Sequence, residues 1–170
     1  GIVCVSQETR ADLVELLGVP ADKTRVIYEG TTVPPVQDGA AERAVLRRYG
    51  ILEPYILFLG NLEPRKNLVR LVRAFYQFAE PIQLVLAGSQ ARAYPELQRE
   101  LQGKKNIVLT GYVDDSSAAA LLRRALLLAY PSVYEGFGLP PLEAMACGCP
   151  VLAGRGGALV NQPGRDQRPE

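Results

Sequence analysis

The stretch YILFLGNLEPRKNLVRLVRAF, residues 55–75, decides the fold. Its first five residues are all apolar, as expected of a strand that is covered on both faces of a parallel sheet. Gly60 then allows a turn. From residue 66 to residue 79, leucine, valine and phenylalanine recur at spacings of three and four, which is typical of a helix with one apolar face. The stretch therefore predicts the strand, turn and helix that begin a β-α-β unit.

The same alternation continues on both sides of this stretch. Apolar runs predict strands at residues 2–5, 25–28, 83–87, 106–110, 126–130 and from 150, the first of them buried. Amphipathic patterns predict helices at residues 8–18, 40–49, 95–101, 115–125 and 140–147. We expect an α/β fold, a Rossmann-like doubly wound parallel sheet with helices on both faces.

Two details concern the ends of these helices. In the helix at 8–18, Leu13, Leu16 and Leu17 share one face and Gly18 ends the helix. The helix at 115–125 is expected to be capped by Asp115 or Ser116.

The length of 170 residues fits one domain, which we place at residues 1–153. Residues 154–170 contain three glycines before Leu159 and little apolar content after Val160, so we expect a disordered tail. The chain does not begin with methionine, and its first residues read as the inside of a strand, as if it were cut from a longer protein.

Composition excludes several classes of function. The 19 basic and 18 acidic residues leave a net charge of +1, which argues against a nucleic-acid partner, so any anion site must be local. The chain has no histidine, which excludes a Ser-His-Asp triad, a Cys-His pair and a histidine-ligated metal site within it.

The three cysteines are an odd number, which favours a reducing, cytoplasmic setting over a disulfide framework. Cys147 and Cys149 are too few for a structural zinc site and are better explained as small buried residues. No apolar run is long enough to cross a bilayer, so we expect no membrane segment in this chain.

In open parallel sheets, ligands bind beyond the carboxyl ends of the strands. The first loop at such an end holds Gly60, Asn61, Arg65 and Lys66. Cations are unfavourable at the start of a helix, and a bound phosphate would resolve that conflict. The alternative is two solvated surface charges.

The second loop contains two carboxylates, Glu135 and Glu143, separated by seven residues across a glycine-bearing turn. Carboxylates accept hydrogen bonds from adjacent hydroxyls, which is how sugars and ribose are held, and both side chains can face one crevice. Gly136 and Gly138 would let backbone N–H groups approach a ligand closely. For Glu143 alone, compensation of the helix dipole is the commoner explanation.

The third loop is Gly111, Tyr112 and Val113, followed by Asp114 and Asp115. Its backbone groups are candidates for contact with a flat base, whereas the two aspartates are better explained by a turn and a helix cap. No carboxylate pair here has the context of a divalent-metal site, so no metal ligands are predicted.

Taken together, these loops resemble a known family. The segment EGFGLPPLEAMACGCPVLA, residues 135–153, resembles the signature of glycosyltransferase family 4, enzymes of the GT-B fold, also described as group 1 glycosyltransferases. Residues 55–75 resemble that family's phosphate-binding loop, and residues 6–30 the beginning of its C-terminal, donor-binding domain. Further matches in the same order are LVLAG (84–88), VLTGYVD (108–114) and YPSVYEGFG (130–138).

The resemblance implies a C-terminal, donor-binding half of a retaining, metal-independent hexosyltransferase that needs no cofactor. Its donor would be GDP- or UDP-hexose, and its acceptor a glycan or a lipid-linked sugar. The motif LEPRKN is similar to the mannosyltransferase-like branch that builds surface polysaccharides. The implied localisation is cytoplasmic, peripheral to the inner face of the membrane.

By position, the resemblance makes Lys66 and Glu135 catalytic, with Lys66 on the diphosphate and Glu135 on the transferred sugar. Glu143 would hold the ribose, and the segment from Gly111 would lie near the base. The implied donor-binding residues are Gly60, Asn61, Arg65, Lys66, Gly111, Tyr112, Val113, Glu135, Gly136, Phe137, Gly138, Leu139 and Glu143.

The chain departs from the family in two ways. Many members carry arginine where this chain has Asn61, which removes one phosphate contact unless Arg65 replaces it. The resemblance also implies that the domain is truncated at its C-terminal end, because the family continues past the strand at residue 150 with more sheet and closing helices. It implies as well that an N-terminal acceptor-binding domain is missing from this chain, so the isolated chain is expected to bind donor weakly and to be inactive.

Other functions stay open at this stage. One is a sugar-nucleotide epimerase or a phosphorylase, although the absence of histidine and the motif at 135–138 argue against both. Another is a non-catalytic or relic sugar-nucleotide-binding module that pairs with a separate acceptor domain.

Overall fold

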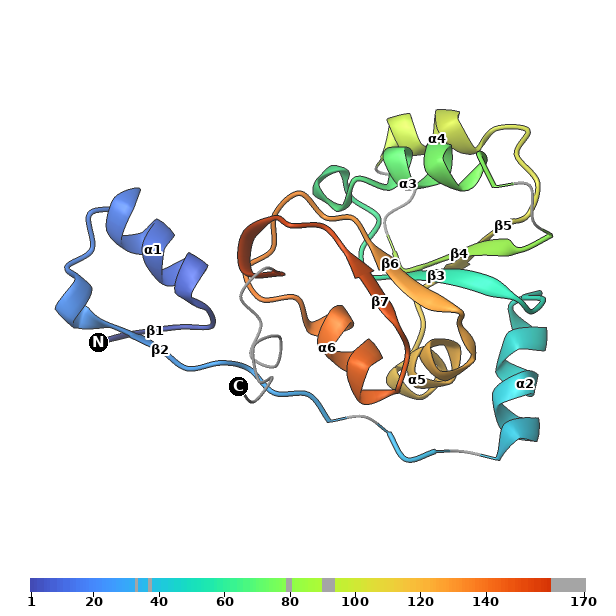
Figure 1. Ribbon diagram of the computed structural model, residues 1–170, viewed down its shortest axis with the longest axis horizontal. Helices are drawn as coiled ribbons and strands as arrows, with labels where there is room; N and C mark the ends of the chain where they lie inside the picture. Colours follow the sequence, from blue (N-terminus) through green and yellow to red (C-terminus); the bar gives the residue numbers. More distant parts are fainter. Residues whose placement is uncertain (33, 37, 79–80, 90–93, 160–170) are drawn as a thin grey trace, which may run out of the picture.

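The computed structural model describes residues 1–32, 34–36, 38–78, 81–89 and 94–159. Its main body is a five-stranded parallel sheet in the order β5-β4-β3-β6-β7 (Figure 1). The strands are β3 (Tyr55–Leu59), β4 (Gln83–Ala87), β5 (Ile107–Gly111), β6 (Leu127–Tyr130) and β7 (Val151–Ala153). The predicted doubly wound parallel sheet is confirmed.

The order of the strands defines the place where a ligand is expected. The chain runs from β3 outward to β4 and β5, then returns to the other side of β3 with β6 and β7. Connections therefore leave β3 and β6 in opposite directions, and in open α/β sheets ligands bind beyond the carboxyl ends of the strands at such a switch point.

Helices cover both faces of the sheet (Figure 1). One face carries α3 (Leu68–Phe75) and α4 (Pro95–Leu101), and the other carries α5 (Asp115–Arg124) and α6 (Leu139–Ala146). An earlier helix, α2 (Gly39–Arg48), packs against α5. The core lies between these layers. Strands β3 and β4 are apolar on both faces, and their residues Leu57, Phe58 and Leu84 are fully buried.

Two helix starts differ from the prediction. The helix expected from residue 66 begins only at Leu68, because Pro64–Lys66 form a 3-10 turn (η2) and Asn67 adopts a left-handed conformation with φ 58°. It also ends at Phe75, so that Phe78 is exposed, and residue 79 lies outside the described residues. The cap of α5 is Asp114 rather than Asp115 or Ser116, since its carboxylate accepts the Ser117 N–H at 2.7 Å.

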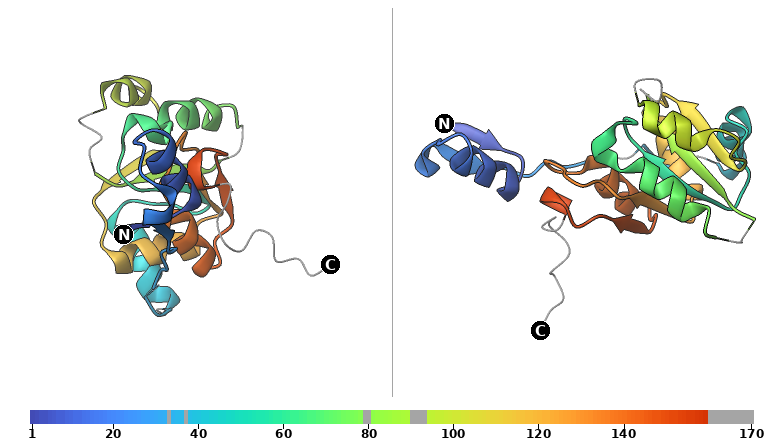
Figure 2. Two further views of the ribbon diagram at one scale, coloured as in Figure 1. Left: turned by 90° about the vertical axis from the view of Figure 1, so that its left-hand side faces the viewer. Right: turned by 90° about the horizontal axis from the view of Figure 1, so that it is seen from above.

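The first thirty residues do not join the main sheet. Strands β1 (Ile2–Cys4) and β2 (Thr24–Val26) pair in parallel with each other only, on either side of α1 (Gln7–Glu15) and a 3-10 turn, η1 (Ala21–Lys23). This unit lies beside the five-stranded body, and the segment after β2 leads back to α2 (Figures 1 and 2).

The expected burial in this unit is therefore wrong. Ile2 and Val3 are exposed and only Cys4 of β1 is buried, because a two-stranded sheet gives each strand one neighbour. Leu16 and Leu17 are exposed as well, since α1 ends at Glu15 before it reaches them.

The expected disordered tail needs a correction at its beginning. Residues 154–159 are described, and Gly157–Leu159 form a 3-10 turn (η4) with Ala158 and Leu159 buried. The glycines of this segment lie so close to the backbone of residues 131–135 that a side chain does not fit. A Cβ at Gly156, for example, would lie 1.9 Å from the Val133 carbonyl oxygen. Residues 160–170 lie outside the described residues. No helix in the described part of the chain is long and apolar enough to span a membrane.

We predict that Gly156→Ala lowers the free energy of unfolding in urea by about 1–3 kcal/mol, as overpacking does. A Cβ at Gly156 meets backbone, which cannot turn aside as a side chain can. The control is Gly30→Ala, where a Cβ has nothing within 4 Å, and it should change the free energy by less than about 0.5 kcal/mol. Equal stability of the two variants would show that the tail does not pack as described.

Candidate functional site

The loops that follow β3 and β6 meet at the switch point. We call residues 60–67 the β3 loop and residues 131–138 the Glu135 loop. The Val133 N–H donates to the Arg65 carbonyl at 3.0 Å, and the Asn67 side-chain amide donates to the Pro131 carbonyl at 3.3 Å. Backbone contacts therefore hold two loops that are far apart in sequence against each other, beyond the carboxyl ends of the two strands.

A buried ion pair lies between these loops. The Lys66 Nζ donates to Glu135 Oε1 at 2.6 Å and to the Tyr130 hydroxyl at 2.6 Å, and it lies 4.7 Å from the centre of the Tyr130 ring. Lys66 and Glu135 are each only 5% exposed. The alternative of a solvated surface charge is thus wrong for Lys66.

Arg65 forms the exposed side of the same cluster. Its guanidinium donates to Glu135 Oε2 at 2.8 Å and to the Tyr134 carbonyl at 3.3 Å, and it pairs with Glu63 at 2.8 Å. The side chain of Arg65 is 46% exposed, so it faces solvent where a ligand would approach. The cations Arg65 and Lys66 and the carboxylates Glu63 and Glu135 give the cluster no net charge. The two carboxylates therefore balance the positive charge that is unfavourable at the start of α3.

The surroundings fix the charge state of Glu135. Burial raises the pKa of this carboxyl, but hydrogen bonds from Lys66 and Arg65 outweigh burial and hold the pKa below its ordinary value. Stability from this carboxylate is present above the ordinary pKa of glutamate and is lost as the pH falls through the lower pKa of the folded chain. Burial also raises the pKa of Tyr130, so its hydroxyl keeps its proton.

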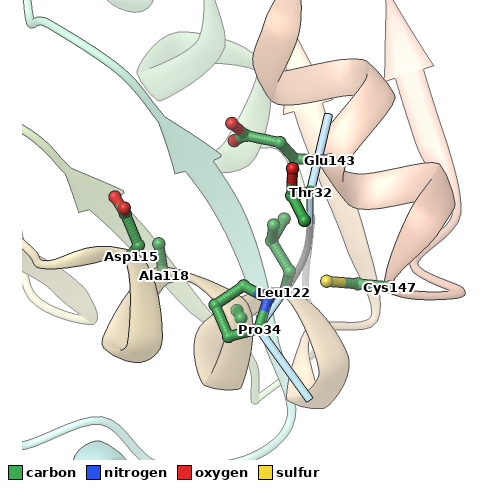
Figure 3. A pocket seen from close by; sticks show the side chains of 8 residues that line it. Thr32, Pro34, Asp115, Ala118, Leu122, Glu143 and Cys147 are labelled. Atoms are coloured by element: carbon green, nitrogen blue, oxygen red, sulfur yellow. The ribbon is translucent and has the colours of Figure 1, made fainter. Parts of the chain in front are cut away.

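Glu143 lies elsewhere. It is half-buried on α6 and lines a pocket of about 110 Å³ between α5, α6 and the segment after β2 (Figure 3). In Figure 3 the Glu143 and Asp115 carboxylates point toward the same side of this pocket, while Thr32 and Pro34 close it. Burial, and then the charge of Asp115, raises the pKa of Glu143.

The two motif carboxylates have different surroundings. Glu143 lines the pocket beside α5, whereas Glu135 pairs with Lys66 and Arg65 between the two loops. The reason is local: Gly138, at φ 98°, turns the chain by a left-handed step into α6, and prolines follow in its first turn. Glu143 then lies one turn into α6, facing α5.

The remaining candidate residues lie around these two centres. Gly60 ends β3 at φ 137° and Asn61 is exposed beside it. Gly111 ends β5 at φ 71°, with Tyr112 77% exposed and Val113 buried. In the Glu135 loop, Gly136 is partly buried, Phe137 and Gly138 are buried and Leu139 is exposed.

Several residues were missed by reasoning from the sequence. Tyr130 was assigned only to a strand, Glu63 only to a turn, and Thr32 only to a proline-bearing loop. Tyr130 ends a strand directly before the Glu135 loop, a position that places its hydroxyl at the site. No sequence signal pointed to Thr32, because the segment after β2 reaches the pocket only in the folded chain.

No group of three or more cysteine, aspartate or glutamate side chains within the described ranges is arranged to hold a metal ion. Cys4, Cys147 and Cys149 are free thiols, the first and last of them buried.

The comparisons with known proteins agree with this fold. The family model described as "Glycosyl transferases group 1" matches residues 49–162, more than half of the chain. The chain therefore belongs to the group 1 glycosyl transferases.

Its relatives include mannosyltransferases. O-antigen chain mannosyltransferase B of Escherichia coli is 33% identical over 89% of this chain and 42% of that protein. D-inositol 3-phosphate glycosyltransferase of Xylanimonas cellulosilytica is 34% identical over 93% of this chain and 41% of that protein. The chain thus spans about two fifths of the length of these curated relatives.

Solved structures share the fold. HepE of Anabaena, crystallised with UDP and glucose, has a TM-score of 0.82 at 23% identity, over 93% of this chain and 45% of that one. Sucrose-phosphate synthase of Thermosynechococcus elongatus has a TM-score of 0.74 at 32% identity, over 92% of this chain and 41% of that one. The expected Rossmann-like half of a GT-B glycosyltransferase is confirmed.

We predict that Lys66→Met lowers the free energy of unfolding by about 3 kcal/mol, because it leaves the buried Glu135 carboxylate with one partner fewer. Lys66→Met combined with Glu135→Gln should recover part of the loss, since the uncompensated charge is then gone. The control is Arg73→Met, which removes an exposed ion pair in which the Arg73 Nε lies 2.8 Å from Glu100 Oε2. Its free energy of unfolding should fall by less than about 1 kcal/mol. Equal losses for Lys66→Met and Arg73→Met would contradict a buried pair.

Proposed function

We propose that the chain is the donor-binding half of a retaining, metal-independent hexosyltransferase. It takes a mannose-like hexose from GDP- or UDP-hexose and passes it to a glycan or lipid-linked acceptor. The observation that carries the proposal is the buried Lys66–Glu135 pair with Arg65 beside it, at the switch point where α/β sheets bind ligands.

The cations suit a diphosphate. The described residues use two of the three donors of the Lys66 ammonium, which leaves one for a phosphate oxygen. Arg65 offers a guanidinium that is nearly half exposed, and it takes the place of the arginine that is absent at Asn61. When the sugar leaves, negative charge develops on the diphosphate, and these two fixed cations stabilise it with no metal ion.

The carboxylates suit hydroxyl groups. Glu135 is held ionised, so it accepts hydrogen bonds from the transferred sugar, with the backbone of residues 136–138 beside it. Glu143, in its pocket between α5 and α6, accepts hydrogen bonds from the ribose, and residues 111–113 lie near the base. In this arrangement Lys66 and Glu135 are catalytic and Glu143 binds the nucleoside.

The rest of the protein supplies the acceptor site. Relatives named as glycosyltransferases are more than twice as long as the matched part of this chain, which supports a second, acceptor-binding domain. The mannosyltransferase relatives support mannose as the transferred sugar and surface polysaccharide as the product class. We place the whole enzyme in the cytoplasm, at the inner face of the membrane.

Calorimetric titration of the chain with UDP, GDP, ADP and dTDP and their hexose conjugates tests this proposal. We expect one diphosphate to bind saturably and equally well with magnesium and with a chelator, and its hexose conjugate to bind more tightly. Binding that requires magnesium, or no binding of any sugar nucleotide, would contradict the proposal.

Three variants separate the roles within the same titration. Glu143→Ala and Lys66→Ala should weaken the diphosphate itself, by about tenfold or more for a lost charge-assisted hydrogen bond. Glu135→Gln should keep the diphosphate affinity and lose the extra affinity given by the hexose. If Glu135→Gln weakened the diphosphate and its hexose conjugate equally, Glu135 would not bind the transferred sugar.

A further inference from the structure

We infer that Thr9 and Asp12 of α1 are positioning residues for the Glu135 loop: α1 holds this loop on both sides of Glu135. The consequence for sugar binding rests on the proposed function, but the contacts themselves do not. They join residues more than one hundred positions apart in the sequence, and Thr9 and Asp12 lie outside the family signature at 135–153.

The first contact is a chain of hydroxyl groups. Ser6 caps α1, and its Oγ accepts the Thr9 N–H at 3.0 Å. The Ser6 hydroxyl then donates to Thr9 Oγ1 at 3.0 Å, and the Thr9 hydroxyl donates to the Gly136 carbonyl at 3.2 Å. A carbonyl oxygen only accepts, so the Thr9 hydroxyl donates the last bond, and its oxygen accepts from Ser6, which is itself buried.

The second contact lies on the other side of Glu135. The hydroxyl of Tyr134 donates to the carboxylate of Asp12. Thr9 and Asp12 are three residues apart in α1 and so share one face of the helix, while Tyr134 and Gly136 flank Glu135. The aromatic ring of Phe137, next in the loop, lies 6.4 Å from that of Tyr28, which follows β2.

The main body holds the same loop at different atoms. The Arg65 carbonyl accepts the Val133 N–H, the Arg65 guanidinium donates to the Tyr134 carbonyl, and the Ala158 N–H donates to the Glu135 carbonyl at 2.9 Å. The body therefore holds the backbone at residues 133–135, whereas α1 holds the Tyr134 side chain and the Gly136 carbonyl. The Gly136 carbonyl and the N–H of residue 137 belong to one planar peptide group, so rotation of that peptide would reorient this N–H.

The composition of α1 supports a role in holding the loop over a role in the core. No residue of α1 is buried, and its apolar residues contribute nothing to the core cluster of the five-stranded body. Removing one polar contact from α1 should therefore leave the core intact and loosen the loop.

The test compares Thr9→Val, Thr9→Ser, Asp12→Ala and Tyr134→Phe in the full chain, with Glu15→Gln on the same helix as control. Amide hydrogen exchange is followed by mass spectrometry without ligand. We expect exchange in peptides covering residues 134–139 to rise about fivefold in Thr9→Val, Asp12→Ala and Tyr134→Phe, the effect of one lost hydrogen bond. Thr9→Ser keeps the hydroxyl and should behave as the unmodified chain does.

Peptides from β3 and β4 should be unchanged in all variants, which separates loosening of the loop from general destabilisation. Two results would overturn the inference. In one, the three test variants exchange at residues 134–139 no faster than Glu15→Gln does; in the other, their exchange rises there and in β3 and β4 alike. A second readout is the ratio of affinities for the hexose conjugate and the diphosphate, which should fall in Thr9→Val and be restored in Thr9→Ser. If the unmodified chain binds no sugar nucleotide, the proposed function fails while the exchange comparison still decides the positioning role.

Discussion

The ion pair between Lys66 and Glu135 is the constraint on which the rest of this site depends. Removing both charges from water is unfavourable, and the close geometry of the pair, with further hydrogen bonds from its neighbours, offsets that cost. Tyr130 accepts from the ammonium and Arg65 donates to the second carboxylate oxygen. The two loops beyond β3 and β6 must therefore meet in one arrangement, with little freedom to shift.

Other features of the chain follow from that arrangement. The Glu135 loop has backbone on two sides, the β3 loop on one and residues 154–158 on the other. Side chains do not fit between such close backbones, which explains the glycines after β7. The third support is α1, which reaches the loop with a threonine and an aspartate and shares no part of the core.

Much of the fold was predictable because it depends on local pattern. The all-apolar YILFL becomes the central strand at the predicted residues, and β4 and α4 also match their predicted bounds. The parallel sheet with helices on both faces was predicted from the alternation of strands and helices. The exceptions are positions where tertiary contacts decide: Asn67 takes a left-handed conformation and shortens α3, and β1 and β2 form a sheet of their own.

The site was predictable by residue type and less by arrangement. Loop position and spacing singled out Lys66, Glu135 and Glu143, but Lys66 lies in a 3-10 turn before α3, and its pairing with Glu135 was not predicted. A pairing over 69 positions leaves no periodic trace in a sequence, and neither does the turn at Gly138 that separates the carboxylates. The glycines after β7 led to the prediction of a disordered segment, because composition alone does not distinguish a flexible segment from one that packs closely against backbone.

The most direct measurement of the central claim is a crystal structure of the protein with its nucleotide-sugar donor bound. The account predicts that the Lys66 Nζ lies about 3 Å from a phosphate oxygen, the length of a charge-assisted hydrogen bond, with the Glu135 carboxylate turned to the sugar hydroxyls. A complex in which Lys66 still binds only Glu135 and Tyr130, with the diphosphate held elsewhere, would contradict it.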